Sequence, residues 1–104
     1  MIARIWHGRT SRENAEEYER LLREEVLLEI AKRSIPGYKG AEIFIREAES
    51  DEVEFITLLR FETLDGVKTF AGKDYETPVI PPESKKLLKR HSEKSRHYRI
   101  VQIN

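Results

Sequence analysis

The sequence contains no cysteine. This absence excludes disulfide bridges, iron–sulfur clusters, thiolate catalysis and cysteine-based zinc sites. A chain without disulfides fits a reducing compartment. We therefore expect a soluble protein of the cytoplasm.

The chain also lacks an excess of charge of either sign. Nineteen lysine and arginine residues balance nineteen aspartate and glutamate residues, so the formal net charge is zero. Proteins that bind nucleic acids usually carry a clear basic excess. We therefore expect no nucleic-acid partner, and a surface without net charge opposes self-association only weakly.

Long apolar runs are missing as well. Arg4 and His7 interrupt the apolar residues at the N-terminus, which argues against a secretory signal peptide. No window approaches the roughly 20 apolar residues that a membrane-spanning helix needs, so we expect no membrane partner. The 104 residues contain no internal repeat or linker, and we expect a single domain over residues 1–104.

The sequence does contain segments with two kinds of hydrophobic spacing, one typical of strands and one typical of helices. Period-two alternation predicts strands, and apolar residues spaced three or four apart predict helices. Strands are expected over residues 2–8, 40–47, 52–62 and 96–103, and helices over residues 11–33, 63–71 and 83–90. Thr10 and Glu13 fit a capping box at the start of the long helix, and Gly72 is placed to end the second helix.

This order of elements predicts an α+β fold with an antiparallel sheet, the ferredoxin-like βαββαβ pattern. The expected sheet order is fourth strand, first, third and second, with the first and third strands parallel in the middle. The fourth strand is then antiparallel to the first. His7 ends the first strand and His97 begins the fourth, so we expect the two imidazoles to lie close together.

The third strand is apolar on both of its faces. Phe55 and Leu59 alternate with Ile56 and Leu58, whereas a strand with one face in water shows polar residues at every second position. Two helices cover only one face of a sheet. We therefore expect the other face to pack against a second sheet in a symmetric homodimer.

The first strand places Trp6 and His7 on opposite faces. We assign Trp6, together with Arg4, to the dimer side of the sheet and His7 to the opposite side. A charge on a buried face needs a partner. The candidate partners of Arg4 are the carboxylates of Glu42, Glu54 and Glu62.

Four segments of the chain are similar to one known family. They are Ile2-Ala3-Arg4-Ile5-Trp6-His7-Gly8, Phe70-Ala71-Gly72-Lys73-Asp74-Tyr75-Glu76, Pro81-Pro82-Glu83 with Leu87-Leu88, and His97-Tyr98. Their order and spacing resemble the antibiotic biosynthesis monooxygenase-like family of the dimeric α/β-barrel superfamily. The resemblance implies a ferredoxin-like protomer that forms a homodimeric α/β barrel, and its characterised relatives include cofactor-free oxygenases of polycyclic phenols and haem-degrading enzymes.

The chain departs from both characterised types of that family. The phenol oxygenases are associated with an Asn, Trp and Tyr set around the substrate, and the haem degraders with an Asn on the first strand and a His on the second helix. Asn14 and Asn104 are the only asparagines here, and residues 63–71 contain no histidine. The resemblance therefore implies the fold more directly than it implies either mechanism.

His7 and His97 are the candidate catalytic residues. A neutral imidazole can take a phenolic or enolic proton near pH 7, which gives an electron-rich anion that reacts with oxygen. The alternative is a pair of strand-end histidines bonded to backbone or water. Two histidines with Asp74 or Glu76 could hold a divalent ion, but no local spacing supports this, and we expect no metal and no cofactor.

The candidate binding residues are Trp6, Tyr75, Asp74 and Tyr18. Trp6 serves either as a wall for a flat ligand or as an anchor of the dimer interface. Asp74 and Tyr75 lie on a loop where a lid could sit, and Tyr75 either bonds a ligand carbonyl or packs the loop onto the sheet. Tyr18 lies on the inner stripe of the long helix, in the core or in a cavity.

Two functional hypotheses follow. The first is a small cofactor-independent monooxygenase that acts on an aromatic or polyketide-like molecule, with His7 as base and His97 beside it. The second is a non-catalytic small-molecule-binding or stress-associated protein with the same dimeric barrel.

Overall fold

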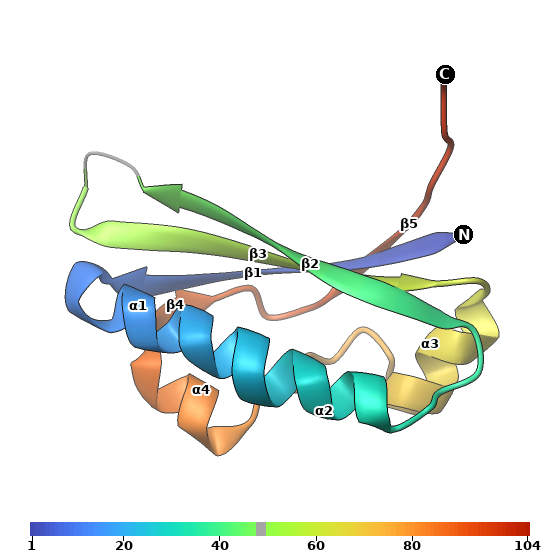
Figure 1. The fold of residues 1–104 in the computed structure, drawn as a ribbon, viewed down its shortest axis with the longest axis horizontal. Helices are drawn as coiled ribbons and strands as arrows, with labels where there is room; N and C mark the ends of the chain where they lie inside the picture. The colour runs from blue at the N-terminus through green and yellow to red at the C-terminus, as the bar shows by residue number, and fades with distance from the viewer. Residues whose placement is uncertain (48–49) are drawn as a thin grey trace.

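The computed structural model describes residues 1–47 and 50–104. They form an α+β domain in which one antiparallel sheet carries its helices on one face (Figure 1). In chain order the elements are β1 (Ile2–Ser11), α1 (Arg12–Leu21), the π-helical turn η1 (Leu22–Val26), α2 (Leu27–Lys32), β2 (Tyr38–Glu47), β3 (Glu52–Phe61), α3 (Leu64–Ala71), α4 (Pro82–Leu87), β4 (Leu88–His91) and β5 (Arg96–Arg99). The predicted α+β class with an antiparallel sheet is confirmed, and the arrangement is compatible with a ferredoxin-like fold.

The sheet order is β2–β3–β1, with β4 and β5 both pairing the far edge of β1. The expected order is thereby confirmed, with β5 in the place of the fourth strand and β4 as an addition that the sequence did not reveal. The expected parallel pairing of the first and third strands is wrong, because β1 and β3 run antiparallel. A helical crossover returns β2 in the direction of β1, and the hairpin then reverses β3 against both.

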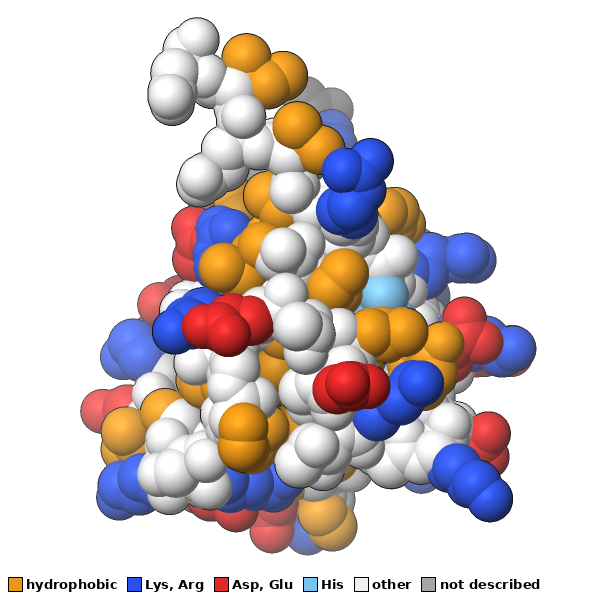
Figure 2. Space-filling view, turned by 90° about the vertical axis from the view of Figure 1, so that its right-hand side faces the viewer, with side chains coloured by type: hydrophobic (Ala, Val, Ile, Leu, Met, Phe, Trp, Pro, Cys, Tyr) orange, Lys and Arg blue, Asp and Glu red, His pale blue; other side chains and the backbone are white. Residues whose placement is uncertain are grey.

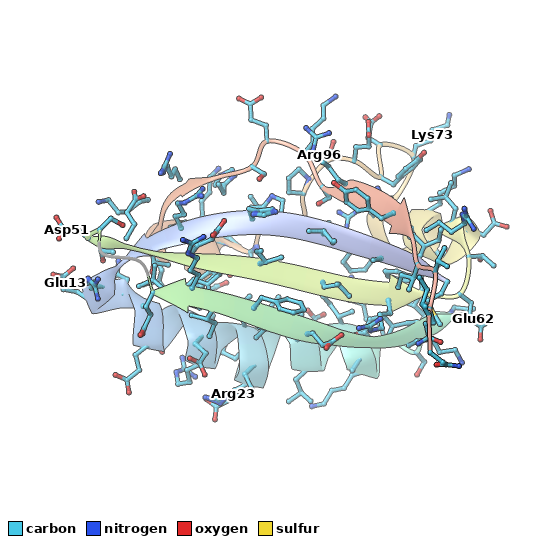
Figure 3. All side chains as sticks on the ribbon, turned by 90° about the horizontal axis from the view of Figure 1, so that it is seen from above. Glu13, Arg23, Asp51, Glu62, Lys73 and Arg96 are labelled. Carbon is cyan, nitrogen blue, oxygen red and sulfur yellow. The ribbon has the colours of Figure 1, made fainter. Side chains whose placement is uncertain are left out.

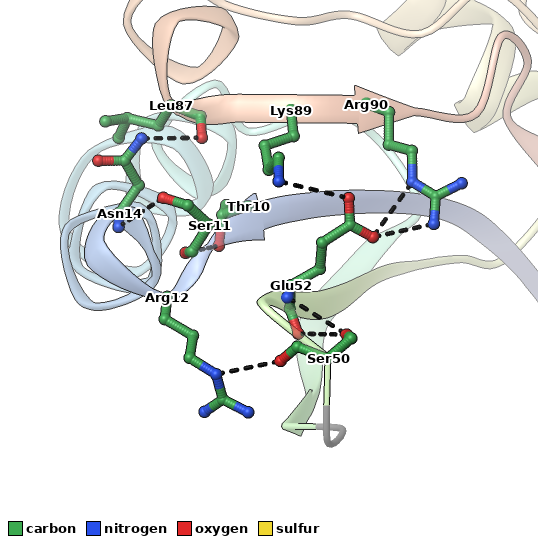
Figure 4. A network of polar contacts seen from close by, with 9 residues as sticks. All are labelled: Thr10, Ser11, Arg12, Asn14, Ser50, Glu52, Leu87, Lys89 and Arg90. Carbon is green, nitrogen blue, oxygen red and sulfur yellow. Dashed lines mark hydrogen bonds and ion pairs between the residues drawn. The ribbon is translucent and has the colours of Figure 1, made fainter.

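The long helix begins one residue later than the capping box predicted. The Ser11 side chain caps it by accepting a hydrogen bond from the Asn14 amide at 3.2 Å, and the buried Thr10 hydroxyl instead donates to the Ser11 carbonyl at 2.8 Å (Figure 4). The predicted pairing of Thr10 with Glu13 is therefore wrong. The cause is that β1 continues to Ser11, so Thr10 is still a strand residue.

A cluster of polar contacts fixes the end of the sheet where this helix starts. The Asn14 side chain donates to the Leu87 carbonyl at 3.4 Å, which joins α1 to the end of α4. Glu52 at the start of β3 pairs with Arg90 at 2.9 Å and with Lys89 at 3.9 Å (Figure 4). These contacts hold the short strand β4 at the edge of β1.

The core lies between the sheet and the helices in two clusters of buried side chains. Tyr18 packs edge-on against Phe55 at 4.8 Å between ring centroids, and Phe61 packs edge-on against Tyr38 at 5.6 Å. The inward residues of β3 alternate with half-buried ones along the whole strand. The helix predicted after Thr63 is confirmed, and Gly72 ends it with a positive φ of 87°.

The opposite face of the sheet carries no helix of the described residues (Figure 3). Ile56 and Leu58 are half-buried on it, and Phe44 is 47% exposed and Tyr98 50% exposed. The prediction that the third strand is apolar on both faces is confirmed. We call these four side chains, together with Ile5, the uncovered apolar face.

Residues 100–104 extend away from the domain on the side of the uncovered apolar face (Figures 1 and 2). Val101 is 62% exposed and Ile103 is 89% exposed, so this segment presents apolar side chains to solvent. In the described part of the chain, no helix combines the length and the apolar composition required to cross a membrane.

Phe61 is a fully buried member of the core cluster that also contains Ile30, Leu59 and Val67. Phe61→Ala removes a fully buried ring that contacts Tyr38 and Phe70, so we expect the free energy of unfolding to fall by about 3–5 kcal/mol. Urea denaturation monitored by circular dichroism measures this loss. Leu28→Ala is the control, because Leu28 is an exposed residue of α2 and its truncation should change stability little. Equal losses in the two variants would contradict the assignment of the core.

Candidate functional site

A cavity lies between the sheet and its helices. β1 and β3 form its floor, α1, η1 and α2 form one wall, and residues 78–81 with Ser84 and Ser95 close the other side. Its volume is about 60 Å³ and it is partly open to solvent, with the exposed Val79 at its rim. A cavity of about 150 Å³ is known to hold benzene. A ring-sized ligand must therefore extend into the open mouth.

The register of β1 and β3 decides which side chains form the floor. Arg4 pairs with Leu59 and Trp6 pairs with Thr57, and these β3 residues point to the helices. Arg4 and Trp6 therefore line the cavity, and their assignment to the dimer side of the sheet is wrong. Both sets of alternate residues on β1 contain apolar side chains, so the sequence alone leaves its orientation open.

Arg4 is only 3% exposed. Its Nη1 donates to the Tyr75 carbonyl and lies 2.9 Å from His97 Nε2, and its Nη2 donates to the Thr77 carbonyl at 3.2 Å. The guanidinium also stacks on Phe70, at 5.4 Å from the ring centre. None of the carboxylates predicted as partners contacts it, because two loop carbonyls 71 and 73 residues away take their place. Burial lowers the Arg4 pKa to about 10, so the group remains cationic at neutral pH.

His97 is held in one protonation state by this contact. Arg4 offers only donors, so Nε2 of His97 must accept the hydrogen bond and the imidazole must be neutral. Burial, followed by the nearby Arg4 charge, lowers the pKa of His97 below its ordinary value of 6.5, against an opposing effect of Glu76. The Tyr75 ring packs edge-on against the imidazole at 5.2 Å. Tyr75 and His97 therefore meet, but behind Arg4 and outside the cavity.

Trp6 is fixed by both ends of its indole. Nε1 donates to the Ser92 carbonyl at 2.9 Å, and the ring packs against His91 at 5.3 Å. Gly8 makes this position possible, because a Cβ there would lie 2.9 Å from a Leu88 methyl group and 3.3 Å from the indole. Trp6 is thus an immobilised aromatic wall of the cavity.

Tyr18, Thr57 and two serines complete the polar surface of the cavity. Burial raises the pKa of Tyr18 to about 12, so its phenol stays neutral. Ser95 is anchored through its amide, which donates to the Glu76 carbonyl at 2.7 Å. Ser84 is 1% exposed, and its hydroxyl has no hydrogen-bond partner among the described residues.

His7 lies on the other side of the sheet. Its side chain is on the uncovered face, where Nδ1 lies 3.2 Å from Glu54, a carboxylate that Arg9 also contacts at 3.2 Å. The expected contact between His7 and His97 is wrong. His97 pairs with Arg4, three residues before His7, and the odd spacing turns the two imidazoles to opposite faces.

Two of the predicted binding residues line the cavity and two do not. Trp6 and Tyr18 form part of its surface. Asp74 is exposed and contributes its carbonyl to a turn with the Thr77 amide at 2.9 Å, while Tyr75 acts through its carbonyl on Arg4. The sequence indicates Arg4 as a charge on a buried face that needs a partner, but not as a residue of the cavity, and Ser84 and Ser95 carry no signal. Among the described residues, no group of three or more His, Asp or Glu side chains is arranged to hold a metal ion.

Comparisons with known proteins identify no family for this chain. A scan against protein-family models found no match, and a search of curated proteins also found none. Any assignment of function therefore depends on the cavity itself and on the quoted resemblance.

The half-buried His97 makes stability dependent on pH. Its folded-state pKa is lowered, so its contribution is complete above pH 6.5 and is lost as the pH falls from 6.5 through the folded-state pKa. We expect Tm to fall between pH 7.5 and 5.5 by about a few degrees more in the wild type than in His97→Gln, whose amide oxygen accepts from Arg4 without titrating. Differential scanning fluorimetry measures both proteins. Parallel Tm curves for the two proteins would contradict this role. Arg90 and Lys39 lower the pKa values of Glu52 and Glu62 from 4.5, but these carboxylates contribute equally in the wild type and in His97→Gln and therefore cancel in the comparison.

Proposed function

We propose that the protein binds a small, mostly apolar molecule in the cavity between the sheet and the helices. The observation that carries this proposal is the cavity itself, an apolar space in which a fixed indole and a buried cation meet. Ligand sites are typically concave, mostly apolar and supplied with a few placed polar groups. We further propose a cytoplasmic location, in keeping with the absence of cysteine.

Binding without chemistry is the function that this geometry supports best. General acid–base catalysis needs a titrating group within hydrogen-bond reach of the substrate. The cavity lining contains no carboxylate and no imidazole among the described residues. His7 lies on the opposite face, and His97 lies behind Arg4.

A second candidate is the cofactor-independent oxygenase implied by the resemblance to the antibiotic biosynthesis monooxygenase-like family. The observation that favours it is Arg4, because a cation in an apolar space stabilises an ionised phenol or enol. Such an anion is the electron-rich form that reacts with oxygen. In this candidate Arg4 holds the anion, and His97 positions Arg4.

We also propose that two copies associate through the uncovered apolar face into a homodimeric α/β barrel. Phe44 on β2 and Tyr98 on β5 are half-exposed at its two edges, and burying such side chains contributes roughly 1.5–3 kcal/mol each before entropy costs. The projecting residues 100–104 supply further apolar surface on the same side. A second copy is the partner that presents a matching apolar sheet.

Filling the cavity tests the first proposal. Single-ring probes (phenol, benzamide and benzoate) are titrated while the fluorescence of Trp6, the only tryptophan, is recorded. Val26→Phe inserts a ring into the cavity wall, so we expect it to weaken binding at least tenfold at an overpacking cost of about 1–3 kcal/mol. Leu28→Phe, at an exposed position of α2 two residues further along the chain, is the matched control and should bind normally.

The failure of all three probes to bind the wild type at millimolar concentration would contradict the proposed function. Oxygen uptake with a quinol or a hydroxy-anthrone, measured on the same variants, separates the two candidates. Uptake that is lost in Val26→Phe and kept in Leu28→Phe supports the oxygenase, and binding without uptake supports a non-catalytic protein.

The dimer is tested by a pair of adjacent residues on β2. Phe44→Asp places a charge on the uncovered apolar face and should yield a monomer, whereas Ile45→Asp places it on the other face of the same edge strand and should leave the dimer intact. Sedimentation velocity at tens of micromolar protein measures the state of each variant. A monomeric wild type would overturn the dimeric barrel.

A further inference from the structure

Arg4 is a buried cation with no counter-ion among the residues that the structure describes. The arginines that do pair with carboxylates, such as Arg20, Arg60 and Arg90, lie at the surface. Within residues 1–47 and 50–104, the partners of Arg4 are two carbonyls, a neutral imidazole and an aromatic ring. Taking a charge out of water is unfavourable unless an opposite charge compensates it. The position is therefore electrostatically favourable for an anion.

The guanidinium also keeps part of its donor capacity unused. Nη1 makes its two contacts with the Tyr75 carbonyl and His97, and Nη2 makes one with the Thr77 carbonyl. The N–H on Nε and a second N–H on Nη2 have no partner among the described residues. These two nitrogens form one edge of the guanidinium, the edge that takes a pair of anionic oxygens with two parallel bonds.

Ser84 provides a second and independent sign of a ligand. Its hydroxyl is buried, lines the same cavity as Arg4 and makes no hydrogen bond within the described residues. A buried polar group without a partner is costly, and native structures leave few of them. Ser84 and Arg4 both line this cavity, so the Ser84 O–H is suited to donate to an oxygen that the cation also holds.

We propose that the natural ligand is a small apolar acid, bound as its anion, with its anionic oxygen on the free edge of Arg4 and Ser84 as a second donor. This rests on the proposed function and adds the chemical class of the ligand. The apolar body lies against Trp6 and Leu59 and continues into the mouth at Val79. A carboxylate and an ionised phenol or enol share this chemistry.

The first experiment compares benzoate with benzamide, which have the same shape and differ in charge. Isothermal titration calorimetry and Trp6 fluorescence on the full chain should give benzoate at least a tenfold lower Kd than benzamide. Arg4→Met should remove this preference, and Arg4→Lys should keep part of it, because a lysine retains the charge but not the paired donors.

Ser84→Ala should fold normally, because the Ser84 hydroxyl makes no hydrogen bond that the substitution would break. Removing an unpaired buried hydroxyl should leave Tm unchanged or raise it, yet it should weaken benzoate binding by about tenfold and benzamide binding much less. A structural role for Ser84 predicts the opposite, a lower Tm with unchanged binding.

The second experiment separates the two sources of the anion. 4-Nitrophenol absorbs differently in its neutral and ionised forms, so binding beside Arg4 should lower its apparent pKa, and Arg4→Met should abolish this shift. A lower Kd for benzoate than for 4-nitrophenolate identifies a carboxylic acid as the ligand class, and the reverse order identifies a phenol or enol.

Equal Kd values for benzoate and benzamide in the wild type, with no pKa shift of 4-nitrophenol, would overturn the proposal and leave the cavity as a site for neutral ligands. Binding of none of these compounds would overturn the proposed function together with it. Normal benzoate preference in both Arg4→Met and Ser84→Ala would place the anion elsewhere and also overturn the proposal.

Discussion

The contact between the Arg4 guanidinium and the two carbonyls of the loop after α3 organises this molecule. It joins the first half of β1 to residues 75 and 77, and through His97 to the edge strand β5. The loop is thereby held over the sheet at the point where residues 78–81 close the cavity. Arg4 therefore has a structural use that satisfies part of its hydrogen-bonding capacity, but carbonyl dipoles do not neutralise its charge. The same residue can close the fold and still favour an anion beside it.

β1 divides two surfaces that the rest of the chain elaborates separately. Its even-numbered residues, among them Arg4 and Trp6, face the helices and the cavity, while Ile5 and His7 face the uncovered side. Substitutions on one face change the ligand site without touching the other face. The side chains of a strand alternate between its two faces. One strand can therefore line a cavity within its own protomer and also present an apolar face to a second copy.

The sequence predicted the parts of the fold that depend on local pattern. The two apolar faces of β3 and the glycine that ends α3 follow from spacing and composition. The strand order follows from the βαββαβ order of the elements by analogy with the ferredoxin-like fold. The orientation of β1 cannot be predicted in this way, because both of its faces contain apolar residues and only its register with β3 selects one. The Arg4 site was hidden for a related reason. Its partners are main-chain carbonyls far along the chain. Every residue has a main-chain carbonyl, so the sequence does not indicate which ones will accept from Arg4.

The balance between binding and catalysis depends on what stands beside the cation. An enzyme that removes a proton needs a base in reach, and the lining offers a neutral phenol, an indole and hydroxyls among the described residues. A ligand that is already ionised needs no base, only a counter-charge and a donor, which Arg4 and Ser84 provide. An oxygenase built on this cavity must therefore take a substrate acidic enough to ionise against Arg4. That requirement makes ligand acidity the property on which both functional candidates depend.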